Sequence, residues 1–170
     1  MCGIAGFWRN TSDQSTEWLE EIASNMADTL IHRGPDDSGV WCEPDAGIAF
    51  GHRRLSIIDI SQGGHQPMVS ADGRYVIIYN GEVYNFQKLR YQLDKLGHRF
   101  KGHSDTEVML AAFVQWGVEA SVKNFNGMFV FAVWDRRDHL LWLVRDRIGE
   151  KPLYYGVQNG TFFFVSELKA

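Results

Sequence analysis

The sequence predicts an α+β fold in which two mainly antiparallel sheets pack face to face and helices cover their outer sides. Short strand-like runs are joined by tight turns, which is typical of hairpins and therefore of antiparallel sheets. The segment 129–134 is apolar at every position, so both of its faces must be buried, as they are between packed layers. Amphipathic helical patterns lie between the strand groups and can cover the sheets.

The N-terminal half contains one predicted helix, over residues 16–31. Leu19, Ile22, Met26 and Leu30 recur on one face of this helix, and Gly34 can end it before a turn at 34–37. The strands predicted in this half are 3–8, 39–43, 47–55, 68–69 and 74–79, the last two forming a hairpin across 71–73.

The C-terminal half contains two predicted helices, one from Asn85 to a stop at Gly97 and one from Ser104 to Trp116. The strands predicted after them are 128–134, 140–145, 153–156 and 161–165, and Asn159-Gly160 is a strong hairpin signal. Residues 166–170 have the pattern of the opening of a further helix.

Composition excludes several classes of function. The 170 residues fit one domain, and a hydrophobic content of 45% excludes general disorder. A net charge of −4 without a basic face argues against nucleic acid as a partner. No apolar run is long enough for a membrane span and no secretory signal is present, so we expect a cytoplasmic protein. The six histidines and two cysteines show no metal-ligand spacing, so no metal is expected, and a Cys2–Cys42 disulfide is conceivable only in an exported protein.

Cys2 is the most informative single residue. If Met1 is removed, the thiol of Cys2 and a free α-amine belong to the same residue, and the amine can serve as the base that activates the nucleophile. The two groups titrate at about 7.7–8.0 and about 8.5, so proton exchange between them costs little near neutral pH. The alternative is an ordinary buried cysteine at the start of a strand, and position alone leaves both interpretations open.

A series of motifs in a fixed order separates these alternatives. The motifs are Cys2-Gly3-Ile4-Ala5-Gly6, His32-Arg33-Gly34-Pro35-Asp36, Arg54-Leu55-Ser56-Ile57, Tyr79-Asn80-Gly81-Glu82-Val83-Tyr84-Asn85, Ser104-Asp105-Thr106-Glu107, Asn126-Gly127-Met128-Phe129, the run from Arg145 to Tyr155 and Ser166-Glu167-Leu168-Lys169-Ala170. Together they resemble the N-terminal glutaminase domain of class II glutamine amidotransferases, above all that of glutamine-dependent asparagine synthetases. The resemblance covers nearly the whole chain.

This resemblance implies a four-layer αββα N-terminal nucleophile (Ntn) hydrolase fold and the hydrolysis of glutamine to glutamate and ammonia. It implies one glutamine amidotransferase type 2 domain over 1–170, cut short at its C-terminal end. The partner would be a C-terminal synthetase domain that uses ATP and Mg to activate aspartate, with no cofactor in the present domain, and the resemblance also allows a homodimer. Two alternatives stay open: another carboxylate acceptor such as a sugar acid, or a non-catalytic regulatory domain of the same fold.

For the reaction itself, the resemblance implies that Cys2 forms a γ-glutamyl thioester. The side-chain amide of Asn80 and the backbone N–H of Gly81 would hold the oxyanion, since glycine lets the backbone approach a substrate closely. The alternative for Asn80-Gly81 is a simple turn after the strand 74–79, because Asn-Gly is a favoured turn pair.

For substrate binding, the resemblance implies that Arg54 holds the glutamine carboxylate and that Asp105 holds its ammonium group, with support from Glu82. Arg53 would point to the opposite face of the strand. Asp105 has an alternative role in the first turn of a helix, where the segment 104–107 forms a capping box. The family also suggests backbone contacts from Leu55, Ile57 and Ile58.

Two further motifs are predicted to be structural. The segment 32–36 is assigned a role at a helix end, and Arg145-Asp146 and Lys151-Pro152 are assigned no chemical step. The run 150–154 could face the partner domain.

Overall fold

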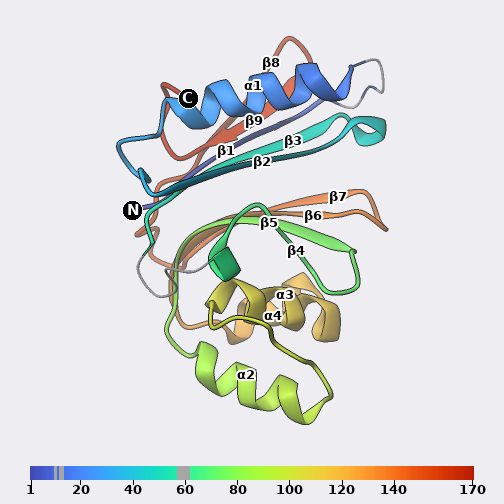
Figure 1. The fold of residues 1–170 in the computed structure, drawn as a ribbon, viewed down its shortest axis with the longest axis vertical. Coiled ribbons are helices and arrows are strands. Elements are labelled where there is room, and N and C mark those ends of the chain that lie inside the picture. The colour runs from blue at the N-terminus through green and yellow to red at the C-terminus, as the bar shows by residue number, and fades with distance from the viewer. Residues whose placement is uncertain (10, 12–13, 57–61) are drawn as a thin grey trace.

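The computed structural model describes residues 1–9, 11, 14–56 and 62–170, and in this part of the chain the predicted architecture is present (Figure 1). One sheet has five strands in the order β2-β3-β1-β9-β8 and the other has four in the order β4-β5-β6-β7, and all described pairings are antiparallel. The strands are β1 (Gly3–Trp8), β2 (Asp37–Glu43), β3 (Ile48–Arg54), β4 (Met68–Val69), β5 (Tyr75–Val83), β6 (Gly127–Asp135), β7 (Leu140–Arg145), β8 (Tyr154–Gln158) and β9 (Thr161–Val165). The helices are α1 (Thr16–Asp28), α2 (Phe86–Lys95), α3 (Asp105–Trp116) and α4 (Val118–Asn124).

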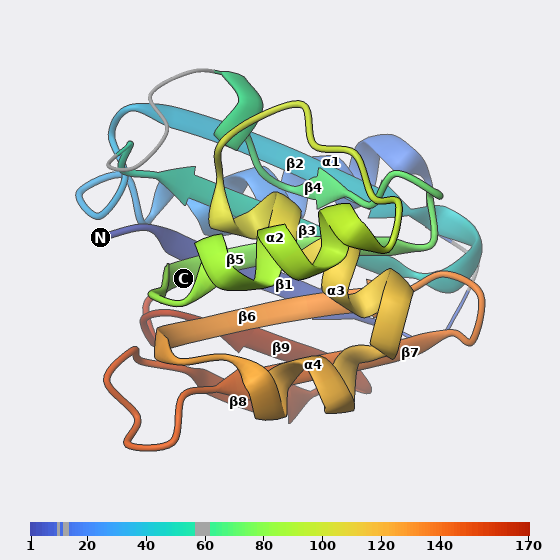
Figure 2. The ribbon, with the colours of Figure 1, turned by 90° about the horizontal axis from the view of Figure 1, so that it is seen from below.

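The helices cover the outer faces of the two sheets. Helix α1 lies along the five-stranded sheet, whereas α2, α3 and α4 lie on the far side of the four-stranded sheet (Figures 1 and 2). None of the helices in the described ranges combines the length and the apolar character that a membrane crossing requires.

Strand β6 confirms the inference drawn from its unbroken apolar sequence. Phe129, Phe131 and Val133 pack with α3 in one core cluster, whereas Val130 and Trp134 pack toward the five-stranded sheet in another. Alternate side chains point to opposite faces of a strand, so a strand buried on both faces must be apolar at every position. The segment therefore lies between two layers, as predicted.

Strand β5 is longer than predicted. It runs through Asn80 and Gly81 to Val83, with Asn80 opposite Val130 and Gly81 opposite Phe129. A Cβ atom at Gly81 would lie 2.2 Å from the carbonyl oxygen of Met128, so only glycine permits this approach of β6. The interpretation of Asn80-Gly81 as a turn is wrong, because pairing with β6 outweighs the local turn preference of these residues.

Three predictions about helices also differ from the structure. Helix α1 ends at Asp28 rather than at 31, and the Thr29 hydroxyl donates to the Met26 carbonyl at 2.8 Å. Gly34 is not the helix stop. Glycine is needed there because the chain passes close to β3: a Cβ atom at position 34 would lie 2.4 Å from the carbonyl carbon of Arg53.

Helix α4 was not predicted. Residues 166–170 form a turn, closed by the Ala170 N–H to the Glu167 carbonyl at 3.1 Å, in place of the predicted helix start.

Candidate active site

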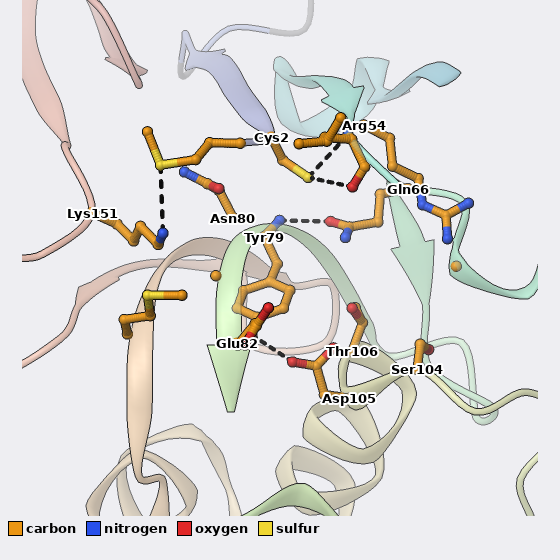
Figure 3. A pocket seen from close by; sticks show the side chains of 15 residues that line it. Cys2, Arg54, Gln66, Tyr79, Asn80, Glu82, Ser104, Asp105, Thr106 and Lys151 are labelled. Carbon is orange, nitrogen blue, oxygen red and sulfur yellow. Dashed lines mark hydrogen bonds between the residues drawn. The ribbon is translucent and has the colours of Figure 1, made fainter. Parts of the chain in front are cut away.

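A cavity of about 160 Å³ opens at one end of the two sheets and brings together residues from seven separate segments. The predicted site residues that line it are Cys2, Arg54, Leu55, Asn80, Gly81, Glu82 and Asp105 (Figure 3). The other two, Ile57 and Ile58, lie outside the described residues. A cavity of about 150 Å³ is large enough for a molecule the size of benzene, so this one suits a small metabolite.

Cys2 precedes β1, and its thiol contacts the backbone of Leu55. The Leu55 N–H donates to the sulfur at 3.4 Å, and the thiol donates to the Leu55 carbonyl at 3.6 Å. Burial raises the pKa of the Cys2 thiol, and the Leu55 N–H, the N-terminal ammonium and the cations of Arg54 and Arg33 offset only part of this rise. The thiol is therefore protonated near neutral pH and needs a base before it can attack a substrate. Cys2 and Cys42 are both free, so the conceivable disulfide is absent.

Asn80 presents an unused hydrogen-bond donor at the cavity. Its side chain is 2% exposed, and its Nδ2 has no hydrogen-bond partner among the described residues. A buried donor without a partner costs about 1–3 kcal/mol, so such a group calls for an explanation. A ligand oxygen in the cavity would supply the missing acceptor. Gly81 follows in the same strand and exposes backbone to the same space.

Arg54 and Arg53 point to opposite faces of β3, as predicted. The Arg53 side chain leaves the site and pairs with Asp28 of α1 at 2.5 Å, whereas Arg54 is buried and lines the cavity. Gly64 packs directly against the Arg54 guanidinium: a Cβ at position 64 would lie 2.0 Å from Nη2. The absence of a side chain at Gly64 therefore allows the observed position of the guanidinium.

Asp105 begins α3 and is held by residues of β5. One carboxylate oxygen accepts hydrogen bonds from the Tyr79 hydroxyl at 2.6 Å and from the Val83 N–H at 3.0 Å. Burial raises the pKa of the Asp105 carboxyl, and the hydrogen bonds from Tyr79 and Val83 offset part of the rise. Since Tyr79 and Val83 belong to the strand that carries Asn80, the same strand sets the positions of the acid and of the amide.

The capping box predicted at this helix start forms only in part. The Ser104 hydroxyl accepts from the Glu107 N–H at 3.3 Å, as an N-cap residue does. The Glu107 carboxylate accepts instead from the N–H groups of Lys101 and Gly102, at 2.7 and 2.9 Å. These hydrogen bonds connect the start of α3 to the preceding loop, next to Asp105.

Arg33, to which the sequence analysis assigned a structural role, holds the backbone of Cys2. Its Nε donates to the carbonyl of Cys2 at 3.0 Å, and its Nη1 donates to the Glu167 carboxylate at 2.9 Å. The hydrogen bond from Arg33 lowers the pKa of Glu167 to about 2, with a further contribution from His32. The motif 32–36 therefore holds the backbone of Cys2 through the ion pair between Arg33 and Glu167. The signal in the sequence that this motif matters was its place in the ordered series of motifs.

Gln66 and Lys151 were also missed as cavity residues. Gln66 is buried, and its side-chain oxygen accepts from the Tyr79 N–H at 2.6 Å, which fixes the backbone of β5. Lys151 is 7% exposed and lines the cavity near Cys2. The motif containing Lys151 was recognised, but nothing local in the sequence indicated that its side chain turns inward.

Comparisons with known proteins agree with this arrangement. The model of the glutamine amidotransferase domain family matches residues 1–170. The chain is 46% identical to "Asparagine synthetase [glutamine-hydrolyzing] 3" of Bacillus subtilis (strain 168), over 100% of this chain and 27% of that protein. It is 33% identical to "Amidase chry2" of Gibberella zeae, over 100% of this chain and 26% of that protein. The chain thus spans about a quarter of the length of these relatives.

The fold has a counterpart of known structure. The glutamine phosphoribosylpyrophosphate amidotransferase of B. subtilis, complexed with ADP and GMP, superposes with a TM-score of 0.80 over 98% of this chain and 42% of that chain. At 21% identity this likeness concerns the fold alone, and it confirms the predicted α+β Ntn-hydrolase architecture with two antiparallel sheets. The chain belongs to the class II glutamine amidotransferase domain family and is related to the glutamine-hydrolysing asparagine synthetases.

Proposed function

We propose that this chain, once Met1 is removed, hydrolyses glutamine to glutamate and ammonia through a thioester on Cys2. The supporting observation is that one cavity of about 160 Å³ is lined by a thiol, an unpartnered amide donor, an arginine and a carboxylate. These are the groups that an amide substrate bearing an α-carboxylate and an α-ammonium group requires.

The attack needs a proton acceptor, because burial keeps the Cys2 thiol protonated. The freed α-amine of Cys2 takes this proton, directly or through a water molecule, as the bond from sulfur to the amide carbon forms. The same proton leaves with ammonia as the C–N bond breaks. Water then cleaves the thioester, which releases glutamate and restores the thiol.

The negative charge that develops on the amide oxygen is held by Asn80 and Gly81. The Nδ2 of Asn80 lacks a partner among the described residues before substrate binds, so its hydrogen bond to the oxyanion replaces no internal bond. Donors placed in advance in this way avoid reorganisation during the reaction.

The α-carbon groups of glutamine are bound at the other end of the cavity. Arg54 can bind the carboxylate through two parallel hydrogen bonds. Asp105 and Glu82 supply negative charge for the ammonium group, and the position of Asp105 is set by Tyr79 and Val83. Leu55 contributes backbone groups beside the sulfur.

We propose aspartate as the acceptor of the ammonia, activated with ATP and Mg by a synthetase domain outside this chain. Relatives named as glutamine-hydrolysing asparagine synthetases support this proposal. The amidase relative keeps another carboxylate acceptor, such as a sugar acid, as the second candidate. An ATP-dependent reaction also agrees with the predicted cytoplasmic location. Asparagine formation from glutamine, aspartate and ATP by the chain joined to its synthetase domain tests the acceptor.

Intact-mass analysis with a diazo-ketone glutamine analogue tests the hydrolysis. We expect loss of Met1 and one covalent adduct in the wild type, with equimolar glutamate and ammonia formed from glutamine. Cys2→Ala removes the nucleophile, so adduct and turnover should both vanish, whereas Cys42→Ala should retain both. Wild-type turnover in Cys2→Ala would disprove the mechanism, and an unreactive wild type without Met1 would favour the non-catalytic alternative.

A further inference from the structure

Lys151 places a buried positive charge in the same cavity as Cys2. Its side chain is 7% exposed, and no carboxylate among the described residues lies within ion-pair distance of its ammonium group. The hydrogen-bond partner of this ammonium is the sulfur of Met1, at 3.5 Å. A thioether sulfur is a weak acceptor, so the charge receives little compensation from its contact.

The loop that carries Lys151 is fixed on both sides of this residue. The Lys151 N–H donates to the Asp146 carboxylate at 3.2 Å, and its carbonyl accepts from Arg145 Nε at 2.5 Å. The same carboxylate accepts from the N–H groups of Ile148 and Glu150, at 3.2 and 3.0 Å. Since an unpaired buried ammonium is costly, a lysine that serves no purpose in the cavity would be expected to turn to solvent.

Removal of Met1 changes the surroundings of this charge. The Met1 side chain contacts Lys151 at one end, and at the other end Met1 is bonded to the nitrogen of Cys2. Excision therefore removes the Met1 sulfur, which is the hydrogen-bond partner of the ammonium among the described residues, and creates a free amine one methionine side chain away. Figure 3 shows Lys151 and Arg54 on opposite sides of Cys2, so Lys151 lies away from the end that is proposed to bind the α-carbon groups of glutamine.

We propose that Lys151 keeps the freed α-amine of Cys2 in its neutral, proton-accepting form. This inference rests on the proposed glutaminase function and adds a positioning residue to it. A free α-amine titrates at about 7.7–8.0, so most of it would be protonated at pH 7 and unable to accept the thiol proton. A nearby fixed cation disfavours the protonated amine and so lowers its pKa. A pKa lower by one makes the ratio of neutral to protonated amine about ten times larger at a given pH.

Other charges act on the same amine and have to be separated from Lys151. The charged groups at the cavity, beside Cys2 and on the loop that carries Lys151 are Arg33, Arg54, Glu82, Asp105, Arg145, Asp146, Arg147 and Glu150. The four arginines act in the same direction as Lys151, and the carboxylates act against it. A comparison of variants at position 151 alone keeps these contributions constant.

The test compares Lys151→Met, which keeps the length and removes the charge, with Lys151→Arg, which keeps the charge. In the Met1-free protein, we expect the acidic limb of the pH profile of kcat/KM for glutamine to move up by about one pH unit in Lys151→Met. At pH 7 the rate should fall about tenfold with little change in KM, and Lys151→Arg should retain most of the wild-type profile. A purely structural role would lower thermal stability without moving the limb.

Direct titration of the amine provides a second measurement. The chain has two cysteines, so ¹⁵N-cysteine labelling followed by NMR gives one α-amine signal, that of Cys2, and one amide signal, that of Cys42. If Lys151→Met does not fold, Lys151→Gln is titrated against the wild type. An unchanged amine pKa, or an equal shift in Lys151→Arg and Lys151→Met, would overturn the inference while the wild-type activity upholds the proposed function. Absence of hydrolysis in the wild type without Met1 would instead disprove the function itself.

Discussion

The two ends of the cavity are built on different principles. At the end formed by Arg54 and Asp105, the charged groups are fixed by their neighbours: Gly64 packs against the guanidinium, and Tyr79 and Val83 hydrogen-bond to the carboxylate. At the end near Cys2, polar groups are left without strong partners. Asn80 Nδ2 has none among the described residues, and the Lys151 ammonium donates to the thioether sulfur of Met1.

This difference matches the demands of the substrate binding and the reaction that we propose for the two ends. Groups that grip a substrate lose less entropy on binding when the protein already holds them in place. Groups that stabilise a transition state are most effective when their hydrogen bonds become strong only as charge develops. Internal hydrogen bonds are therefore useful at the first end and would compete with the reaction at the second.

Replacement of Asn80 by alanine should give the largest effect at the reacting end. We expect kcat for glutamine hydrolysis to fall by about 10²–10³ with a smaller change in KM, because this donor is expected to act mainly on the oxyanion. Steady-state kinetics of Asn80→Ala and of Asn124→Ala provide the comparison, since the Asn124 amide is bound to the Ala120 carbonyl on the surface. Equal kinetics in the wild type and in Asn80→Ala would remove the distinction between the two ends.

His52 provides a test of the support beneath the binding end. Its Nε2 donates to the Tyr79 carbonyl at 3.0 Å, and its buried Nδ1 has no partner in the described part of the chain. Burial lowers the pKa of His52 to about 4. As the pH falls, His52 therefore becomes protonated near pH 6.5 in the unfolded chain but only near pH 4 in the folded chain. The free energy of unfolding should therefore decrease by up to about 3 kcal/mol as the pH falls through this interval.

Urea unfolding of wild type and His52→Gln between pH 7 and pH 4 measures this dependence. The variant should lose the part of the slope due to His52, while His98→Gln, at a histidine that is only partly buried and hydrogen-bonds to Gln115, should keep it. Identical slopes in wild type and His52→Gln would show that this histidine does not couple pH to folding.

Gly64→Ala should produce the smallest of these effects. It tests whether the proposed binding end depends on the fixed position of Arg54. The added Cβ would meet the guanidinium of Arg54, which can move, so we expect little loss of stability but an increase of about tenfold in KM for glutamine. Gly156→Ala is the matched control, because a Cβ there meets no atom within 4 Å. An unchanged KM in Gly64→Ala would show that Arg54 binds nothing in the cavity, or that its position tolerates displacement.

Much of the fold could be predicted because its signals are local. The apolar run in β6 requires burial on both faces, and the turn residues between the later strands indicate hairpins. The end of β5 could not be predicted in this way. Asn80-Gly81 has the local pattern of a turn, and only the neighbouring strand β6 decides that it stays extended. The short helix α4 has too few residues for a clear helical period.

The candidate site shows the same division. Residue type and order by themselves indicated the family, and they predicted a nucleophile and groups suited to an amino acid substrate, because thiol, amide, guanidinium and carboxylate each have limited chemistry. The tertiary structure was needed to show which of these groups share a cavity and which polar atoms remain without partners. It placed Lys151 and Gly64 at the cavity and the Arg33 side chain against the Cys2 carbonyl. The physical reason is that direction and burial of a side chain depend on contacts between segments far apart in the chain, which no local pattern contains.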